Sequence, residues 1–152
     1  MLNITLVTVG KIKEAYLSEA AASYIKRIKP YGRLNILELK AEAFSDATKD
    51  KAKKIEAARI EAVLDNKQEA QIYLMSERGA LFNSLDFAAT ITQRQEIVLV
   101  IAGSLGFAKE LENKYPQISL SPLTFPHELA RVILLEQIYR AATIINNKAY
   151  HY

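Results

Sequence analysis

The sequence contains no cysteine. Disulfide bonds, thiolate metal sites and cysteine nucleophiles are therefore excluded, and a reducing compartment is permitted. A large excess of one charge is also lacking, because 20 Lys and Arg residues against 17 Asp and Glu leave a formal net charge of +3. So small an excess does not by itself indicate nucleic-acid binding.

Long hydrophobic runs are absent as well. No apolar stretch approaches the length of a membrane span. Residues 1–7 lack the basic region and the long apolar core of a signal peptide, so we expect them to begin a strand. We therefore expect a cytoplasmic protein that binds no membrane. With 152 residues, 50% of them hydrophobic, the chain is long enough for one compact domain over residues 1–152.

The spacing of apolar residues predicts strands that alternate with helices. The strongest strand is 96–102, whose centre is apolar at every position and therefore fits burial on both faces of a sheet. Such alternation is typical of the α/β class, with a mostly parallel sheet flanked by helices. We expect strands at 2–9, 33–39, 71–76, 96–102 and 118–120, and helices at 13–29, from 45 or 46 to about 66, at 84–94, at 107–114 and from 126 to about 146.

The ends of three predicted strands are candidate ligand-binding segments, because open α/β sheets bind ligands beyond the carboxyl ends of their strands. These segments are 76–79, 102–106 and 120–125. Gly103 and Gly106 would let a ligand approach the backbone and use free N–H groups. The segment matches neither a dinucleotide fingerprint nor a phosphate loop. An ordinary strand-to-helix turn remains an equally simple explanation of two glycines.

The segment before the last predicted helix carries two hydroxyl groups. Ser121 and Thr124 would point into the same cleft as Gly103. Pro126 is well placed near the first helical position, and Thr124 is the nearest residue able to cap the helix. Helix initiation alone is the alternative explanation of this segment.

The two histidines of the chain are His127 and His151. Two histidines without a cluster of acids do not make a metal site, so no metal is expected. His127, on the first turn of a helix, is typical of a structural residue. His151 lies between Tyr150 and Tyr152 and can act as a general base or hydrogen-bond donor near neutral pH.

Charged residues of the last helix and of the first half of the chain allow two explanations each. The spacing predicts that Glu128 pairs with Arg131, and Glu136 with Arg140, on the helix surface. The basic residues of the first half alternate with acids, which is typical of solvated helix faces. A face that concentrated them would suit a phosphate backbone. They are Lys11, Lys13, Lys26, Arg27, Lys29, Arg33, Lys49, Lys51, Lys53, Lys54 and Arg59.

These segments together resemble one family over the whole chain. The matching stretches are LVTVGK at 6–11, IAGSLG at 101–106, LSPLTFPH at 120–127, RV at 131–132, EQIYRA at 136–141 and YH at 150–151. The chain is similar to the small SPOUT-class methyltransferases, the ribosomal RNA large subunit methyltransferase H family. Members of that family methylate N3 of a pseudouridine in helix 69 of bacterial 23S rRNA.

The resemblance implies a fold, a cofactor and partners. The C-terminal segment would thread a loop to form a trefoil knot, and two copies of the chain would form a homodimer that acts on 23S rRNA in the ribosome. S-adenosyl-L-methionine would be the methyl donor, with no metal. The residues implied for its site are Met75, Ala102, Gly103, Leu120, Ser121, Pro122, Leu123, Thr124 and Phe125.

The resemblance also implies the residues that carry the chemistry. We expect His151, with Tyr150, to orient or deprotonate the target base, and Arg140 and Arg131 to contact the RNA or brace the subunit interface. The chain departs from the family in three places. Ala102 replaces the first of two glycines and fits if its φ is negative, Ala149 replaces a proline, and Tyr152 stands where relatives are often basic.

Three other functions fit parts of the sequence. A SPOUT methyltransferase could act on another RNA, such as a tRNA, and a non-catalytic ribosome-binding module could share the fold. A flavodoxin-like binder of small molecules would need a phosphate-binding loop at Gly103, and the residues of such a loop are missing.

Overall fold

A computed structural model describes residues 1–92 and 95–152. The described residues form one five-stranded sheet in the order β2-β1-β4-β3-β5, and each pair of neighbouring strands is parallel. The predicted parallel α/β architecture is therefore confirmed. The strands are β1 (Leu2–Val9), β2 (Gly32–Leu39), β3 (Gln71–Leu81), β4 (Ile97–Ile101) and β5 (Gln117–Ser119).

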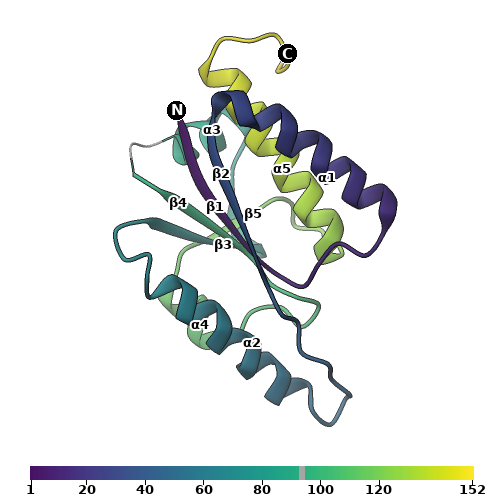
Figure 1. Cartoon of the computed structure of the whole chain (residues 1–152). Helices are drawn as coiled ribbons and strands as arrows, with labels where there is room; N and C mark the ends of the chain where they lie inside the picture. The colour runs from purple at the N-terminus through teal and green to yellow at the C-terminus, as the bar shows by residue number, and fades with distance from the viewer. Residues whose placement is uncertain (93–94) are drawn as a thin grey trace.

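Helices cover both faces of this sheet (Figure 1). α1, α3 and α5 lie on one face, where α5 packs against both others, and α2 and α4 lie on the opposite face. The predicted end of the third helix, near Arg94, falls outside the described residues. The helices are α1 (Ala15–Ile28), α2 (Lys49–Leu64), α3 (Ser84–Ile91), α4 (Lys109–Lys114) and α5 (His127–Ile145), with a short 3-10 turn at Lys29–Tyr31.

β4 divides the hydrophobic core into two layers. All five of its residues are buried, as its unbroken apolar sequence predicts. Because side chains alternate between the faces of a strand, Leu99 packs with α1, α3 and α5, whereas Val98 and Val100 pack with α2 and α4. The central position of β4 therefore fixes the carboxyl ends of its neighbours, β1 and β3, at one edge of the sheet.

β3 is longer than its sequence indicates, continuing to Leu81 instead of ending near Ser76. Its extension pairs with β5, and a register shift allows both Met75 and Ala80 to face Ile118. Gly79 makes this possible, because a Cβ there would lie 2.6–2.7 Å from the β5 backbone. Gly79, which the sequence places after the third strand, lies within β3 and permits a close strand contact.

Helices α2, α4 and α5 begin later than the sequence predicts, by up to a few residues. α2 begins at Lys49, with Thr48 rather than Ser45 at the cap position, and the Thr48 hydroxyl accepts a hydrogen bond from the Ser45 N–H at 2.9 Å. α4 begins at Lys109 because Ala108 is extended. α5 begins at His127, where the capping position is held by a proline and no side chain caps the helix.

The C-terminal knot stays a prediction. Segment 120–126 and the loop that follows β4 line one cavity, an arrangement compatible with that prediction. Within the described ranges, no helix is long and apolar enough to cross a membrane.

Candidate active site

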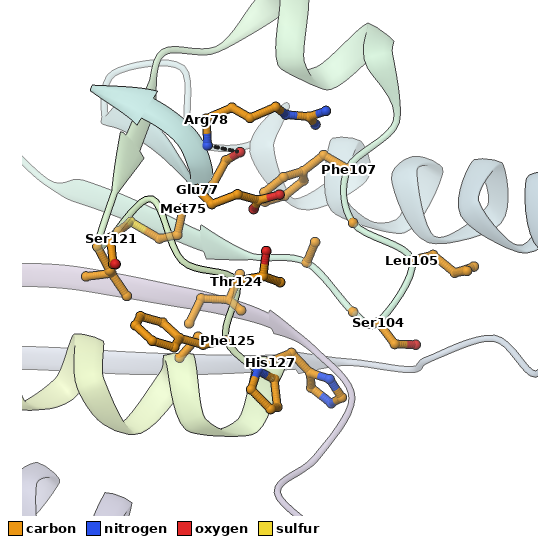
Figure 2. Close-up of a pocket in the computed structure, with 18 of the residues that line it drawn as sticks. Met75, Glu77, Arg78, Ser104, Leu105, Phe107, Ser121, Thr124, Phe125 and His127 are labelled. Atoms are coloured by element: carbon orange, nitrogen blue, oxygen red, sulfur yellow. Dashed lines mark hydrogen bonds between the residues drawn. The ribbon is translucent and has the colours of Figure 1, made fainter. Parts of the chain in front are cut away.

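A cavity of about 730 Å³ opens at the carboxyl edge of the sheet. Its walls come from residues 75–78 of β3, the loop 102–107 after β4, and the segment 120–127 that leads into α5. In Figure 2, side chains of all three segments surround one space, with Met75 from β3, Phe107 from the loop and Thr124 from the last segment. The structure thus brings together the three strand ends that the sequence singles out.

All but one of the predicted cofactor residues lie in these walls, the exception being Pro122. Pro122 turns the backbone between two lining residues without lining the cavity itself. The others are Met75, Ala102, Gly103, Leu120, Ser121, Leu123, Thr124 and Phe125.

The glycine loop is closed by a turn in which the Gly106 N–H donates to the Gly103 carbonyl at 3.0 Å. Gly106 has φ +72°, and no atom lies within 4 Å of the position that a Cβ would take. The loop therefore leaves open space beside its backbone. Ala102 does not have a positive φ, so the alanine is accommodated as predicted.

The Ser121 hydroxyl belongs to its own loop. It accepts a hydrogen bond from the Leu123 N–H at 3.1 Å, and the Ser119 hydroxyl donates to the Ser121 carbonyl at 2.9 Å. The hydrogen bond that the Ser121 hydroxyl accepts holds the loop in shape, and the hydroxyl can still donate its own O–H. The expected contact of Ser121 with a ligand therefore stays a prediction. Thr124 remains the hydroxyl residue whose side chain Figure 2 shows in the middle of the site.

Charged side chains surround one part of the cavity. Glu77 and Arg78 come from the extension of β3, Glu112 from α4, and Lys53 from the first turn and a half of α2. Arg78 forms an ion pair with Glu112, and its backbone N–H donates to the Ser76 hydroxyl at 3.3 Å (Figure 2). Both signs of charge are thus available to a ligand with charged ends.

His127 lines the cavity as well, although its position on a first helical turn suggested a structural residue. Its Nε2 lies 4.0 Å from the position of a Cβ on Gly10. The next residue, Glu128, accepts hydrogen bonds from the Lys13 and Glu14 N–H groups, and the bond from Lys13 is the main cause that lowers the Glu128 pKa. α5 is therefore fastened to the loop after β1, which holds His127 at the site.

Glu77, Arg78 and Ser104 lie in the candidate segments 76–79 and 102–106, but sequence reasoning missed Phe107 and His127 as lining residues. A signal for Phe107 was present, because it follows directly on the segment after the strongest strand. His127 required the additional knowledge of where α5 begins.

The predicted catalytic residues gather at the other end of α5. Arg140 binds Glu136 through Nη2 at 2.6 Å, the Tyr150 hydroxyl donates to Glu136 at 3.0 Å, and Arg140 Nη1 lies 3.4 Å from His151 Nδ1. The predicted pair of Glu136 and Arg140 is confirmed. None of these residues lines the cavity. A helix rise of about 1.5 Å per residue separates Arg140 from His127 by roughly 20 Å.

Arg131 has a different partner from the one its spacing predicts. It is buried and binds Glu38 of β2 at 2.7 Å, with Nη1 3.5 Å from the Thr8 hydroxyl, whereas Glu128 binds backbone N–H groups. The predicted surface pair with Glu128 is therefore wrong. Arg131 joins α5 to the sheet, and a position this deep does not suit an RNA contact.

Within residues 1–92 and 95–152, no three His, Asp or Glu side chains gather in a way that could hold a metal ion. The fold and the cavity define an α/β protein with a ligand site at the carboxyl edge of a parallel sheet.

Comparison with known proteins identifies the family. Residues 2–151 match the family model described as predicted SPOUT methyltransferase. The chain is 39% identical over 160 residues to the ribosomal RNA large subunit methyltransferase H of Carboxydothermus hydrogenoformans, and 38% identical over 160 residues to that of Listeria monocytogenes serotype 4b. Each alignment covers 99% of this chain and 99% of the relative.

Solved structures show the same fold at low identity. The A. aeolicus TrmH/SpoU tRNA modifying enzyme aligns with a TM-score of 0.55 and 14% identity, covering 96% of this chain and 78% of that one. A second structure, which concerns the 2-OH methylation of C/U34 on tRNA, aligns with a TM-score of 0.53 and 15% identity. This alignment covers 93% of this chain and 97% of that one. The chain belongs to the SPOUT methyltransferases and, among them, to the ribosomal RNA large subunit methyltransferase H family. It is a methyltransferase.

Proposed function

We propose that this methyltransferase transfers a methyl group from S-adenosyl-L-methionine to N3 of a pseudouridine in helix 69 of 23S rRNA, acting on the ribosome. The observation that carries the proposal is full-length identity of 38–39% to enzymes named ribosomal RNA large subunit methyltransferase H. The chain keeps the family stretches where the cavity is built, at 101–106 and 120–127.

The cavity fits the proposed cofactor in size and chemistry. Its volume of about 730 Å³ lies within the range of about 300–1,000 Å³ that is usual for small-molecule sites. Met75, Leu120 and Phe125 offer apolar surface for a flat ring system. The backbone around Gly103 can approach a ligand closely, and Glu77 lies where it would attract an ammonium or sulfonium cation.

The reaction makes two demands on this chain. When bound, S-adenosylmethionine would supply an electrophilic methyl group on its sulfonium. The walls of the cavity must hold the reactants in line, which can contribute roughly 7–11 kcal/mol to lowering a barrier. In addition, the weakly acidic N3–H of the target base must lose its proton before the nitrogen is a good nucleophile, so a side chain near the base must assist that loss.

Tyr150 is better suited to orienting the base than to removing its proton. Burial, together with the hydrogen bond to Glu136, raises the pKa of the Tyr150 phenol. The phenol therefore keeps its proton at neutral pH and serves as a donor. We assign the orienting role to Tyr150 and Arg140, and direct contact with the base to His151, which is exposed.

The separation along α5 favours a homodimer in which one copy supplies the segment 150–151 to the cavity of the other. Within one chain, roughly 20 Å of helix separates Arg140 from the cavity at His127. Leu123, in the cavity wall, is 70% exposed, and Leu81 and Leu85 are 62% and 55% exposed. Apolar side chains of this size are suited to burial by a second copy.

Mass spectrometry of 23S rRNA tests the function. Ribosomes that lack the modification would be incubated with the protein and S-adenosylmethionine carrying a labelled methyl group. We expect one labelled methyl on a helix 69 pseudouridine. Labelling of tRNA but not of 23S rRNA would instead assign the enzyme to another RNA, and no binding of S-adenosylmethionine by calorimetry would contradict the cofactor.

A further inference from the structure

We propose that Glu136 is the positioning residue that holds Tyr150 and Arg140, and through them His151, in the geometry needed at the methyl-transfer site. This inference rests on the proposed function, because that function gives the segment 150–151 its chemical role. Glu136 itself is set back from the exposed imidazole and acts through its neighbours.

The Glu136 carboxylate is the centre of a hydrogen-bond network. Its Oε1 accepts from Arg140 Nε at 3.1 Å, from Arg140 Nη2 at 2.6 Å and from the Tyr150 hydroxyl at 3.0 Å. The side chain is only 18% exposed, so these charge-assisted bonds are shielded from much of the competing water. One carboxylate thus ties together a residue of α5 and a residue that lies beyond the end of α5.

The second oxygen of Glu136 is also held. Gln137 Nε2 donates to Oε2 at 2.6 Å, and the Gln137 carbonyl oxygen accepts from the Ser84 hydroxyl of α3 at 3.0 Å. The carboxylate is therefore oriented from both sides. This arrangement fixes the direction in which Oε1 faces Tyr150.

Aromatic packing completes the enclosure of Tyr150. Its ring packs edge-on against Tyr139 with centroids 4.8 Å apart, and the Arg140 guanidinium lies 4.7 Å from the Tyr150 centroid. Such pairs favour one ring orientation. Beyond α5 the chain turns back through Asn147, which has φ +50°, and the Lys148 N–H donates to the Thr143 carbonyl at 2.9 Å.

The network also determines which atom His151 presents. Arg140 carries only donors, so the Nδ1 of His151, 3.4 Å from Arg140 Nη1, accepts. The neutral imidazole then carries its proton on Nε2. Glu136 keeps the Arg140 guanidinium in place, and in this arrangement neutral His151 presents an N–H donor. Of the two roles expected of His151, this arrangement suits orienting the base rather than removing its N3 proton.

Hydrogen exchange tests the ordering directly, without any substrate. Mass spectrometry would follow the amides of residues 146–152 in the unaltered protein and in Glu136→Ala and Glu136→Gln. We expect faster exchange in Glu136→Ala and a smaller increase in Glu136→Gln, which keeps a hydrogen-bonding oxygen but loses the charge. Glu110→Gln, an exposed change on α4, is the matched control. Unchanged exchange in folded Glu136→Ala would overturn the proposal.

Two further measurements separate positioning from general destabilisation. We expect the ¹⁵N spectrum of neutral His151 to show the Nε2–H form, and to show a mixture of tautomers in Glu136→Ala. We also expect kcat to fall by about 100-fold, the scale of a small misplacement of reacting groups, while affinity for S-adenosylmethionine measured by calorimetry stays within about twofold. Partial recovery of kcat in Glu136→Gln would confirm that geometry is responsible.

These measurements distinguish failure of the inference from failure of the proposed function. If the unaltered protein methylated no RNA but Glu136→Ala still exchanged faster at 146–152, the proposed reaction would be wrong and the ordering by Glu136 would stand. If methylation were intact in Glu136→Ala, with kcat unchanged, the positioning role would be wrong and the proposed reaction would stand.

Discussion

Glu56 and Gly103 lie against one another behind the wall of the cavity, where a Cβ on Gly103 would be 3.1 Å from Glu56 Oε2. Glu56 is 5% exposed, and its Oε1 accepts a hydrogen bond from the Glu42 N–H at 3.0 Å. The same Cβ would be 3.1 Å from Val9 Cγ1. A buried carboxylate of α2 and the end of β1 therefore leave too little space for a Cβ at this position unless the loop or its neighbours shift.

We expect Gly103→Ala to weaken binding of S-adenosylmethionine, because the loop must move by a few tenths of an ångström toward the cavity to relieve both contacts. Overpacking of this kind costs about 1–3 kcal/mol, part of it in stability and part in cofactor affinity. Isothermal calorimetry and thermal unfolding would measure the two parts.

Ala102→Gly is the control for Gly103→Ala, since it changes the neighbouring position without adding an atom. We expect it to retain cofactor affinity. If Gly103→Ala bound the cofactor as tightly as the unaltered chain, the loop would be more adaptable than its contacts indicate.

Elements whose signal is local could be predicted from the sequence. The unbroken apolar run of β4 indicated burial on both faces, and the structure buries every residue of it. The strand ends gave the location of the cavity because parallel strands share one carboxyl edge. Both inferences need only the periodicity of side chains along a strand.

Features that depend on distant contacts could not be predicted in this way. The sequence predicts that the third strand ends at Ser76, but pairing with β5 extends β3 through Gly79. Arg131 had a nearby acid at a favourable helical spacing, yet it binds Glu38, 93 positions away in the sequence. Sequence spacing also gave no indication that α5 carries Arg140 away from the cavity that it was expected to serve.

We expect Arg131→Met to destabilise the protein while leaving RNA affinity unchanged. Arg131 is 8% exposed and its guanidinium joins α5 to Glu38 of β2. Breaking such a pair costs up to about 3–5 kcal/mol when both partners are buried. Because the Glu38 side chain is 35% exposed, we expect the free energy of unfolding to fall by about 2 kcal/mol. Urea unfolding would measure this change.

Arg33→Met, which removes an exposed arginine from the same strand as Glu38, is the control for Arg131 and should change stability little. A loss of RNA affinity in Arg131→Met without a loss of stability would restore the RNA-contact role that the burial of Arg131 argues against.

We expect the folded protein to become less stable at acidic pH because of Glu96. Burial alone would raise the Glu96 pKa, but hydrogen bonds from Lys67, at 2.8 Å, and from Thr5 outweigh it and lower the pKa below its ordinary value of 4.5. A lowered pKa stabilises the folded state above about 4.5, and this stabilisation is lost as the pH falls through the folded-state pKa.

We therefore expect Glu96→Gln to lower the free energy of unfolding by about 1 kcal/mol at pH 7, and by progressively less at lower pH. Urea unfolding between pH 7 and pH 3 measures the difference. Glu110→Gln changes an exposed acid on α4. Its stability should differ little from that of the unaltered protein at any of these pH values. A difference between Glu96→Gln and the unaltered chain that stayed constant with pH would contradict this assignment.

The amino-terminal part of α2 should contact RNA phosphates. Lys53 borders the cavity, and Lys51 and Lys54 are exposed beside it. Among the described residues these lysines form no ion pair. We expect Lys51→Glu with Lys54→Glu to weaken binding to a helix 69 RNA and to reduce the slope of log affinity against log salt by about one for each lost phosphate contact. An unchanged affinity and an unchanged salt slope in this double variant would contradict a phosphate contact at this surface.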